Sequence, residues 1–265
     1  MMKPFSPALR RTLSPTLPLM AALLLTPAFA SVAADNSQAV AKAVANVQTL
    51  LKAPFHQAEL EQDKSRLPVK MVQFLNITPG MTVMDLGAGG GYSTEILSAA
   101  VGDKGTVYAQ NNHHLEQMAS GKIIQQLYSR IEAGKLDNVK AEIWEMDAIP
   151  LHNQLDLVFW GNNIHDYYHS IGEQGTLAIL KNVYAALKPG ATFAVVDHIG
   201  TAGNDNAKLH RIQPELIKAV LEKAGFVDAE TSDIYHNAAD SHELSVFDKQ
   251  IFGHTDRYFI KVKKP

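Results

Sequence analysis

The chain has 265 residues, of which 46% are hydrophobic and 19% are charged, and it contains no cysteine. This length and composition are those of a globular protein that can bury one substantial core. The formal net charge of −3 is not offset by any basic stripe, which argues against general affinity for nucleic acid. The absence of cysteine is compatible with an oxidising compartment.

The first 30 residues have the pattern of a secretory signal peptide. Three basic residues precede an apolar run over residues 17–26 that is too short to span a membrane, and small-x-small motifs at residues 28–30 and 31–33 are candidate cleavage sites. Cleavage after Ala30 removes three of the 24 basic residues and none of the 27 acidic ones, which leaves a charge of −6. We therefore expect an exported, periplasmic protein without a stable membrane span.

Two other interpretations of this leader stay open. The segment could remain uncleaved and act as a membrane tether. Alternatively, Arg10 and Arg11 are a loose match to the twin-arginine signal, which exports folded proteins. Ordinary export of the unfolded chain is favoured, because paired arginines are common in leader peptides.

Residues 31–80 form a helical segment ahead of the main domain, which spans residues 81–265. Apolar residues at helical spacing predict an amphipathic helix over Ser37–Leu51. The polar stretch Gln57–Arg66 and the short helix Val69–Leu75 follow, and a turn at Pro79 and Gly80 ends the segment. These leading helices are expected to cover a bound ligand.

The rest of the chain is organised around residues 81–93. An apolar run, Val83–Leu86, predicts a short buried strand, and Ser93–Ala100 predicts a helix. The residues between them include Gly87, Gly89 and Gly91. A strand, a glycine turn and a helix together form the start of a βαβ unit, in which backbone N–H groups and the positive end of the helix face a ligand.

The spacing of these glycines discriminates between nucleoside ligands. The dinucleotide motif G-x-G-x-x-G requires a glycine at the position of Tyr92, so a nicotinamide oxidoreductase is disfavoured. The chain instead has G-x-G-x-G, preceded by Asp85 at the end of the strand. A carboxylate there would repel a pyrophosphate, but it suits a ligand that carries an ammonium and a sulfonium. A turn that merely packs a strand on a helix is the alternative.

The motif Asp85–Gly91 resembles the cofactor loop of class I S-adenosylmethionine-dependent methyltransferases. Leu187–Gly190 before the fifth strand and Ala224–Phe226 before the sixth extend the resemblance to about two-thirds of the chain. His210–Ile212 and the ending from Thr255 to Pro265 look like an exported, poorly characterised subgroup of predicted methyltransferases. The resemblance implies seven strands, the last inserted antiparallel, and S-adenosylmethionine as the cofactor.

The predicted elements alternate along the chain and indicate an α/β fold with a right-handed, doubly wound, mostly parallel sheet. After the first strand, further strands are expected at residues 105–110, 139–146, 155–160, 191–196, 227–234 and 255–262. Helices are expected at residues 115–131, 176–187 and 210–224.

The resemblance also implies positions for the cofactor. Asp85 and the glycine turn would hold the methionine part, Asn111 the ribose and Asp147 the adenine. The full set of expected cofactor-binding residues is Asp85, Gly87, Ala88, Gly89, Gly91, Asn111, Asp147, Ala148 and Asn162. Asn111 stands where an acid is expected to accept the ribose hydroxyls, and an amide can accept one hydroxyl and donate to another without charge assistance.

Polar and aromatic residues at positions 161–169 follow the fourth strand and suit the edge of an active site. The alternative is a helix N-terminus capped by Asn162 or Asn163. Neutral histidine can accept a proton near pH 7, so the candidates for a catalytic base are His165, Asp166, His198 and His210.

No metal is assigned, but a metal-assisted site stays an alternative. Asp166, Asp197 and His198 lie at the ends of adjacent predicted strands, and His165 and His169 are four residues apart on a predicted helix. The expected function is methyl transfer to an unidentified small-molecule acceptor. A non-catalytic protein that binds a nucleoside or metabolite, or a partner, is the second interpretation.

Overall fold

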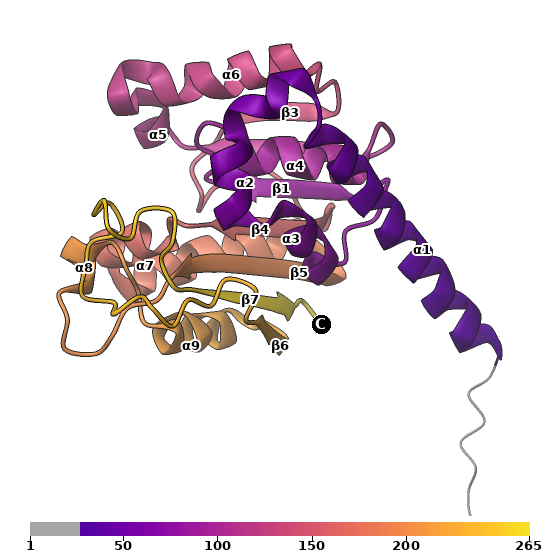
Figure 1. Ribbon diagram of the computed structural model, residues 1–265. Helices are drawn as coiled ribbons and strands as arrows, with labels where there is room; N and C mark the ends of the chain where they lie inside the picture. The colour runs from indigo at the N-terminus through magenta and orange to yellow at the C-terminus, as the bar shows by residue number, and fades with distance from the viewer. Residues whose placement is uncertain (1–26) are drawn as a thin grey trace, which may run out of the picture.

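A computed structural model describes residues 27–265 and shows one seven-stranded sheet covered by helices on both faces (Figure 1). The predicted signal peptide lies almost entirely outside the described residues. The strands are β1 (Thr82–Leu86), β2 (Thr106–Asn111), β3 (Val139–Ile143), β4 (Leu155–Gly161), β5 (Leu187–His198), β6 (Val227–Ser232) and β7 (Arg257–Lys263).

The strand order is β3-β2-β1-β4-β5-β7-β6, and β7 is inserted antiparallel between β5 and β6. Figure 1 shows the opposed arrowheads of β5 and β7. The remaining pairs along the order, from β3 to β5, are parallel. The chain order therefore reverses between β1 and β4, and this switch point is where open α/β sheets bind their ligands. The predicted seven-stranded, doubly wound fold with an antiparallel last strand is confirmed.

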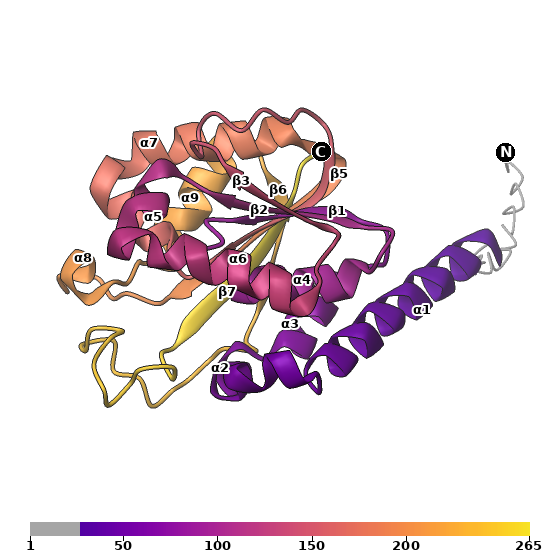
Figure 2. The same cartoon turned by 90° about the horizontal axis from the view of Figure 1, so that it is seen from above.

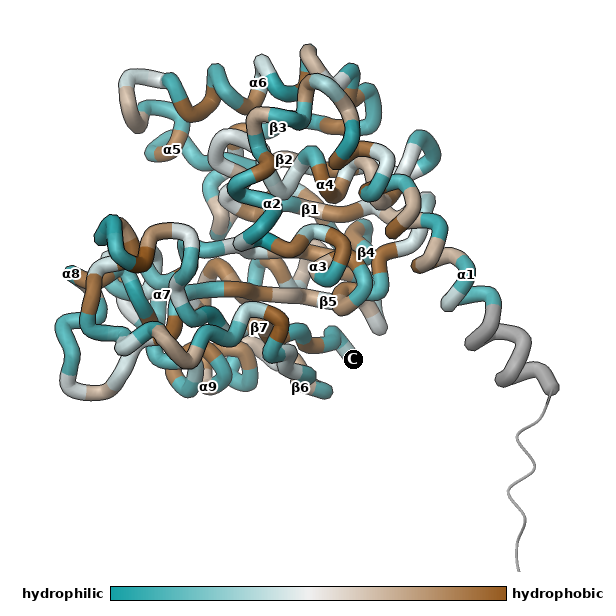
Figure 3. Tube along the Cα trace, in the orientation of Figure 1, coloured by the Kyte–Doolittle hydropathy of each residue, from teal (hydrophilic) through white to brown (hydrophobic). Residues whose placement is uncertain are grey.

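Alternate residues of the central strands enter two separate cores, one on each face of the sheet. Met84 and Val158 face α7 (Ile164–Ala186) and α9 (Pro214–Ala224). Val83 and Leu157 face α3 (Pro68–Leu75) and α4 (Tyr92–Val101). Figure 2 shows the two helical layers on opposite sides of the strands, and Figure 3 shows that the strands carry the most hydrophobic segments.

The leading segment contains α1 (Pro27–Leu50), the short helix η1 (Pro54–Glu59) and α2 (Leu60–Arg66) ahead of α3. The first half of α1 extends away from the body of the protein, as Figures 1 and 2 show. Its last turns pack on α4, where Ala43 and Val47 are fully buried. None of the helices in the described part of the chain is long and apolar enough to cross a membrane.

A buried polar network joins the leading segment to the first turn of α4. The ring of His56, which is fully buried, lies 3.1 Å from both Glu95 and Asp63. The hydroxyl of Tyr92 donates to Asp63 at 2.7 Å, and Arg130 pairs with Glu95. This network fixes α2 beside the carboxyl ends of the strands, so that the last residues of α2 reach the functional site.

Several predicted elements differ from the structure, and the fifth strand begins at Leu187 instead of residue 191. The helix expected over residues 115–131 is broken into α5 (His113–Gln117), η2 (Met118–Gly121) and α6 (Lys122–Gly134), because Ala119, Ser120 and Gly121 all adopt positive φ values. The third strand ends at Ile143, short of the expected residue 146. The helix expected to begin at residue 176 begins at Ile164 and is interrupted by Gly172, with a φ of +71°.

The helix expected to begin at His210 also begins elsewhere in the structure. A single turn, α8 (Asn206–Leu209), ends at His210, whose φ of +55° is left-handed. The next helix, α9, begins only at Pro214, since proline is favoured in the first turn of a helix. His210 is therefore held in a tight turn between two helices.

Candidate active site

The glycine loop joins β1 to α4. Gly87, Gly89 and Gly91 have φ values of +66°, +56° and +84°, which other residues rarely adopt. A Cβ atom at Gly89 would meet nothing within 4 Å, whereas one at Gly87 would lie 2.8 Å from the side chain of Asn163. The loop is thus packed at its start and open at Gly89.

Asp85 lies beneath this loop and not on its open side. Its side chain is buried against the face of the sheet that carries α4, and it accepts a 2.6 Å hydrogen bond from the hydroxyl of Thr94. Burial raises the pKa of Asp85 to about 6, although the hydrogen bond from Thr94 and the charge of Arg66 oppose the shift. The carboxylate can act on a cationic ligand through its electric field and by fixing the first turn of α4.

The amides at the end of β2 close on the glycine loop. Asn111 accepts a 2.8 Å hydrogen bond from the amide of Gly89 and donates to its carbonyl oxygen at 3.2 Å. Gln110 accepts a 3.0 Å bond from the amide of Gly87. A carboxylate at position 111 could not donate to the carbonyl of Gly89, which gives a physical reason for the amide found there.

The residues expected to hold the adenine follow β3. Asp147 and Ala148 are both exposed, while the preceding Met146 is buried and packs close to Gly87. The exposed pair lies at the carboxyl edge of the sheet, next to the ends of β2 and β3. Their role toward the cofactor stays a prediction.

The end of β4 presents two asparagines with different tasks. Asn163 donates to the carbonyl oxygen of Gly87 at 3.2 Å and accepts from the indole N–H of Trp160. The helix N-terminus expected as an alternative is confirmed, with Asn163 at the N-cap position of α7, but the side chain of Asn163 makes no capping hydrogen bond. The Oδ1 atom of Asn162 is buried and has no hydrogen-bond partner among the described residues.

A histidine–aspartate pair lies at the ends of the neighbouring strands β4 and β5. The Nδ1 atom of His165 is 2.8 Å from Asp197, and the backbone N–H of His165 donates to the same carboxylate at 2.9 Å. Burial alone would lower the pKa of His165, but the carboxylates of Asp197 and Asp166 outweigh it and raise the pKa to about 10. His165 is therefore an imidazolium at neutral pH.

His198 lies beside His165 in the opposite protonation state. Its Nδ1 atom is 2.7 Å from the hydroxyl of Thr255, and the two imidazole rings are 5.8 Å apart. Burial lowers the pKa of His198 to about 3, with further lowering by the charges of His165 and two arginines and an opposing effect of Asp197. His198 is thus neutral at pH 7, and its unprotonated ring nitrogen can accept a hydrogen bond.

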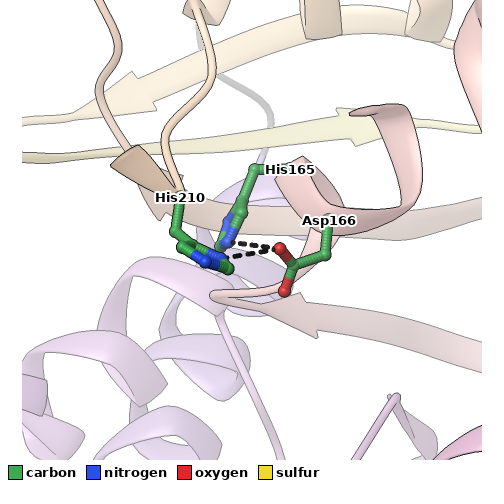
Figure 4. Close-up of side chains that lie close together, drawn as sticks. All are labelled: His165, Asp166 and His210. Atoms are coloured by element: carbon green, nitrogen blue, oxygen red, sulfur yellow. Dashed lines mark hydrogen bonds and ion pairs between the residues drawn. The ribbon is translucent and has the colours of Figure 1, made fainter. Parts of the chain in front are cut away.

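Asp166 connects this pair to the surface. Its Oδ1 atom lies 3.2 Å from Nε2 of His165 and 2.9 Å from Nδ1 of His210, as Figure 4 shows. His165 is buried, Asp166 is exposed and His210 is half-buried. The structure therefore brings together all four residues that the sequence singled out as catalytic candidates.

The metal-binding groups that the sequence suggested do not come together as sets of free ligands among the described residues. Asp197 is engaged by His165 and by the backbone of His198, and Nε2 of His169 lies 2.8 Å from the carbonyl oxygen of Arg211. Among the described residues, the group whose ligand atoms approach within 4.8 Å of one another is His165, Asp166 and His210.

A cavity of about 370 Å³ opens over these side chains. Sequence analysis missed its walls, which come from α2, from the loop between β6 and β7 and from the start of β7. The lining residues are Gln62, Ser65, Arg66, Asn162, His165, Asp166, His198, Val246, Phe247, Phe252, Gly253, Thr255 and Arg257. The segment from Thr255 to Phe259 is part of the family resemblance, but no sequence pattern predicts that Arg257 lies near the histidines.

Comparisons with known proteins support the fold and the cofactor-loop motif. The family of protein-L-isoaspartate(D-aspartate) O-methyltransferases matches residues 55–142. A solved S-adenosylmethionine-dependent methyltransferase from Aquifex aeolicus superposes with a TM-score of 0.56 at 20% identity, covering 84% of this chain and 98% of that one. The chain has the fold and the cofactor-loop motif of class I S-adenosylmethionine-dependent methyltransferases.

A curated relative of this methyltransferase fold is the tRNA (adenine(58)-N(1))-methyltransferase TrmI of Thermus thermophilus. It is 36% identical over 85 residues, which are 31% of this chain and 33% of that protein. The match thus spans about a third of the relative's length. The family match and this relative support S-adenosylmethionine as the cofactor, as the glycine spacing predicted.

The fold alone does not establish the reaction. The solved [4+2]-cyclase SpnF superposes with a TM-score of 0.56 at 17% identity, covering 81% of this chain and 83% of that one. Its name describes a cyclase and not a methyltransferase. The chemistry of this chain has to be argued from its own site.

The residues at this methyltransferase fold's switch point fit S-adenosylmethionine. The loop is open at Gly89, and the unpartnered carbonyl oxygen of Asn162 is an acceptor for an ammonium group. The buried carboxylate of Asp85 adds negative charge beneath the loop. Asn111 can reach a ribose only by exchanging its hydrogen bonds with Gly89 for bonds to the hydroxyls.

Proposed function

We propose that this protein transfers the methyl group of S-adenosylmethionine to a small-molecule acceptor bound in the cavity over β4, β5 and β7. One observation carries the proposal. Buried His165, held by Asp197, and half-buried His198, held by Thr255, lie with their rings 5.8 Å apart at the switch-point side of a methyltransferase cofactor loop. A protonated and a neutral imidazole side by side offer a hydrogen-bond donor and an acceptor to one bound molecule.

The cofactor is held by the glycine loop and the strand ends around it. Gly87, Ala88, Gly89 and Gly91 form the cradle, with Asp85 supplying negative charge from below. Asn162 binds the ammonium, Asn111 the ribose, and Asp147 and Ala148 the adenine. When bound, S-adenosylmethionine supplies an activated methyl group on a sulfonium, and the protein contributes alignment and proton transfer.

The acceptor is oriented by the histidine pair. His165 is held by Asp197, and its buried Nε2 atom lies 3.2 Å from Asp166 without forming a well-aligned hydrogen bond among the described residues. Neutral His198 would accept a hydrogen bond from the acceptor group and orient the lone pair of that group toward the activated methyl group. Asp166 and His210 connect His165 with solvent and allow protons to be exchanged.

A small molecule is favoured over a macromolecule as the acceptor. TrmI is named for a tRNA and the matching family for a protein residue, but the family match ends at residue 142, before every histidine of the cavity. The cavity volume of about 370 Å³ suits a small organic molecule. The formal charge of −3 gives no electrostatic support for binding tRNA.

Export to the periplasm is part of the proposal. It is supported by the basic start, the short apolar run and the small-x-small motifs before residue 34. Amino-terminal sequencing of the protein recovered from the periplasm tests it. A new amino terminus at residue 31 or 34 is expected, and recovery of the intact chain in the cytoplasm would reject export.

Transfer itself is tested with S-adenosylmethionine labelled in its methyl group. The full chain is incubated with a small-molecule extract, and the labelled products and S-adenosylhomocysteine are measured by mass spectrometry. Labelled product is expected with the wild-type protein and at least tenfold less with His198→Ala. If the cofactor binds but no label is transferred, the second interpretation, a non-catalytic nucleoside-binding protein, takes the place of the enzyme.

A further inference from the structure

Two arginines of the cavity have no part in the chemistry proposed above. Arg257, at the start of β7, is only 7% exposed, and its Nε atom has no hydrogen-bond partner among the described residues. Its Nη2 atom donates to the carbonyl oxygen of Ser65. Within the described chain, neither Arg257 nor Arg66 forms an ion pair with a carboxylate closer than 4 Å.

The unpaired state of Arg257 is unusual, because removing a guanidinium from water is unfavourable unless an anion or a full set of acceptors replaces the water. Arg211, the other arginine buried to this degree among the described residues, shows the ordinary solution. Both of its terminal nitrogens bond Asp240, at 2.9 and 3.0 Å, and two carbonyl oxygens accept hydrogen bonds from its Nε and Nη1 atoms. Arg257 has a tyrosine ring 4.5 Å away and one carbonyl oxygen instead.

A second cation faces the same space. Arg66, the last residue of α2, lines the cavity and lies 5.5 Å from the ring of Tyr92. Burial first and the charge of Arg66 second lower the pKa of Arg257 to about 10, while Tyr235 and two nearby aspartates oppose the shift. Two guanidiniums that repel each other across a cavity are stabilised by an anion bound between them.

The opposite wall of the cavity is apolar. The loop between β6 and β7 contributes Val246, Phe247 and Phe252, and the two phenylalanines are 63% and 65% exposed. Figure 3 shows hydrophobic stretches in this loop beside the sheet edge. Large exposed apolar side chains that line a cavity mark a surface that a ligand covers.

We propose that the cavity binds an organic acid, whose carboxylate is held by Arg66 and Arg257 and whose apolar body lies against Phe247 and Phe252. The claim that this acid is the methyl acceptor rests on the function proposed above. The claim that the acid binds here rests on the cavity alone. A planar carboxylate matches the paired donors of a guanidinium, and the aromatic loop residues favour an aromatic body. The substrate class is therefore small aromatic carboxylic acids.

Binding is tested with matched pairs of acid and amide, which differ in charge but hardly in shape. Benzoate, phenylacetate and 3-phenylpropionate are titrated by calorimetry into the full chain, each beside its primary amide, and inorganic phosphate is titrated separately. At least one acid is expected to bind tenfold or more tightly than its amide and than phosphate. Equal affinity of acid and amide in all three pairs would overturn the proposal, and tighter binding of phosphate would assign the site to phosphate instead.

Variants then locate the anion. Arg66→Gln should weaken the bound acid at least tenfold and leave the amide unchanged, because Arg66 ends an exposed helix and its loss spares the core. Lys64→Gln is the matched control: it removes one charge from the same helix, at a side chain that is 67% exposed and outside the cavity lining. Equal loss in both variants would reduce the effect to general electrostatics and reject the site.

Arg257→Lys provides a second variant that keeps the charge in case Arg257→Gln does not fold. The single ammonium offers no paired planar donors, so acid affinity should fall at least fivefold at an unchanged melting temperature. Unaltered acid affinity in a folded Arg257→Lys protein would remove Arg257 from the proposal.

Binding of S-adenosylmethionine distinguishes failure of the proposed methyltransferase function from failure of the proposed acid site. S-adenosylmethionine is titrated into the same preparations. If it does not bind but the acid binds in an Arg66-dependent way, the methyltransferase function fails and the acid site stands. If S-adenosylmethionine binds and no acid exceeds its amide, the function stands and the acid site fails.

Discussion

The buried carboxyl group of Asp85, beneath the cofactor loop, has a raised pKa that affects the stability of the protein. Burial raises its pKa from 3.8 to about 6, so the folded protein binds this proton more tightly than the unfolded chain. The stability contributed by Asp85 is therefore lost as the pH rises from about 4 to about 6, and it stays lost above that window. A shift of about two units corresponds to roughly 3 kcal/mol. A carboxylate kept at this cost indicates a role in binding a cation.

Asp85→Asn should remove this penalty. Urea unfolding at pH 7.5 is expected to show a gain of about 1–3 kcal/mol over the wild type, with the gain shrinking toward pH 4. The same variant should bind S-adenosylmethionine at least tenfold more weakly, because the field of the carboxylate is gone. A variant that is less stable at pH 7.5 than the wild type would contradict the assigned pKa.

Asn111 gives a second prediction. Asn111→Asp replaces a donor to the carbonyl oxygen of Gly89 with a second acceptor, which should destabilise the ligand-free protein by about 1–2 kcal/mol. The freed carboxylate should at the same time tighten binding of S-adenosylmethionine by accepting the ribose hydroxyls. Thermal melts and calorimetry measure the two effects. An unchanged or weakened affinity would place the ribose elsewhere.

The histidine pair can be observed directly. Nitrogen chemical shifts of the imidazole rings at pH 7.5 should show His165 protonated at both nitrogens and His198 neutral, since their pKa values are raised to about 10 and lowered to about 3. Asp197→Asn should bring the titration of His165 down toward pH 6.5 by removing its closest charge. Two histidines that both titrate near pH 6.5 in the wild type would contradict the assigned roles.

At the scale of elements, α2 depends on the buried polar network under it. His56→Ala should cost about 2–4 kcal/mol, because it removes the buried ring that links Glu95 to Asp63 and leaves them only Arg130 and Tyr92 as partners. Hydrogen exchange should accelerate most in residues 54–66, and acid binding should weaken because Arg66 loses its support. Exchange that accelerates equally in α9 would show general destabilisation and not a local effect.

The sequence predicted elements well where a pattern is local and poorly where tertiary contacts decide. The strand, turn and helix around Gly89 follow from apolar periodicity and glycine spacing. The start of α7 was predicted only as an alternative, because residues 161–169 are polar and aromatic, without helical periodicity, and the helix is held by the pairing of His165 with Asp197. The side chain of Asn163 does not cap this helix, since its oxygen accepts from the indole of Trp160 and its nitrogen donates to Gly87, which is distant in sequence.

At the scale of the whole molecule, the sheet order follows from the alternation of elements and the class of fold that the glycine loop indicated. The catalytic candidates were predictable, because parallel strands end at one edge and bring His165 and His198 together. The cavity was not. Arg66 comes from the leading segment and Arg257 from the last strand. Both line the cavity because β7 inserts between β5 and β6 while the network at His56 fixes α2.

The measurement that tests this account most directly is calorimetry of the full chain with S-adenosylmethionine. The account predicts saturable binding to the wild type and its loss in Gly89→Val, because the φ of +56° excludes a β-branched residue. Gly80→Val, which also replaces a glycine with a positive φ but lies at the opposite end of β1, should bind normally if it folds. The absence of heat with the wild-type protein at millimolar ligand, or equal binding by Gly89→Val, would contradict the account.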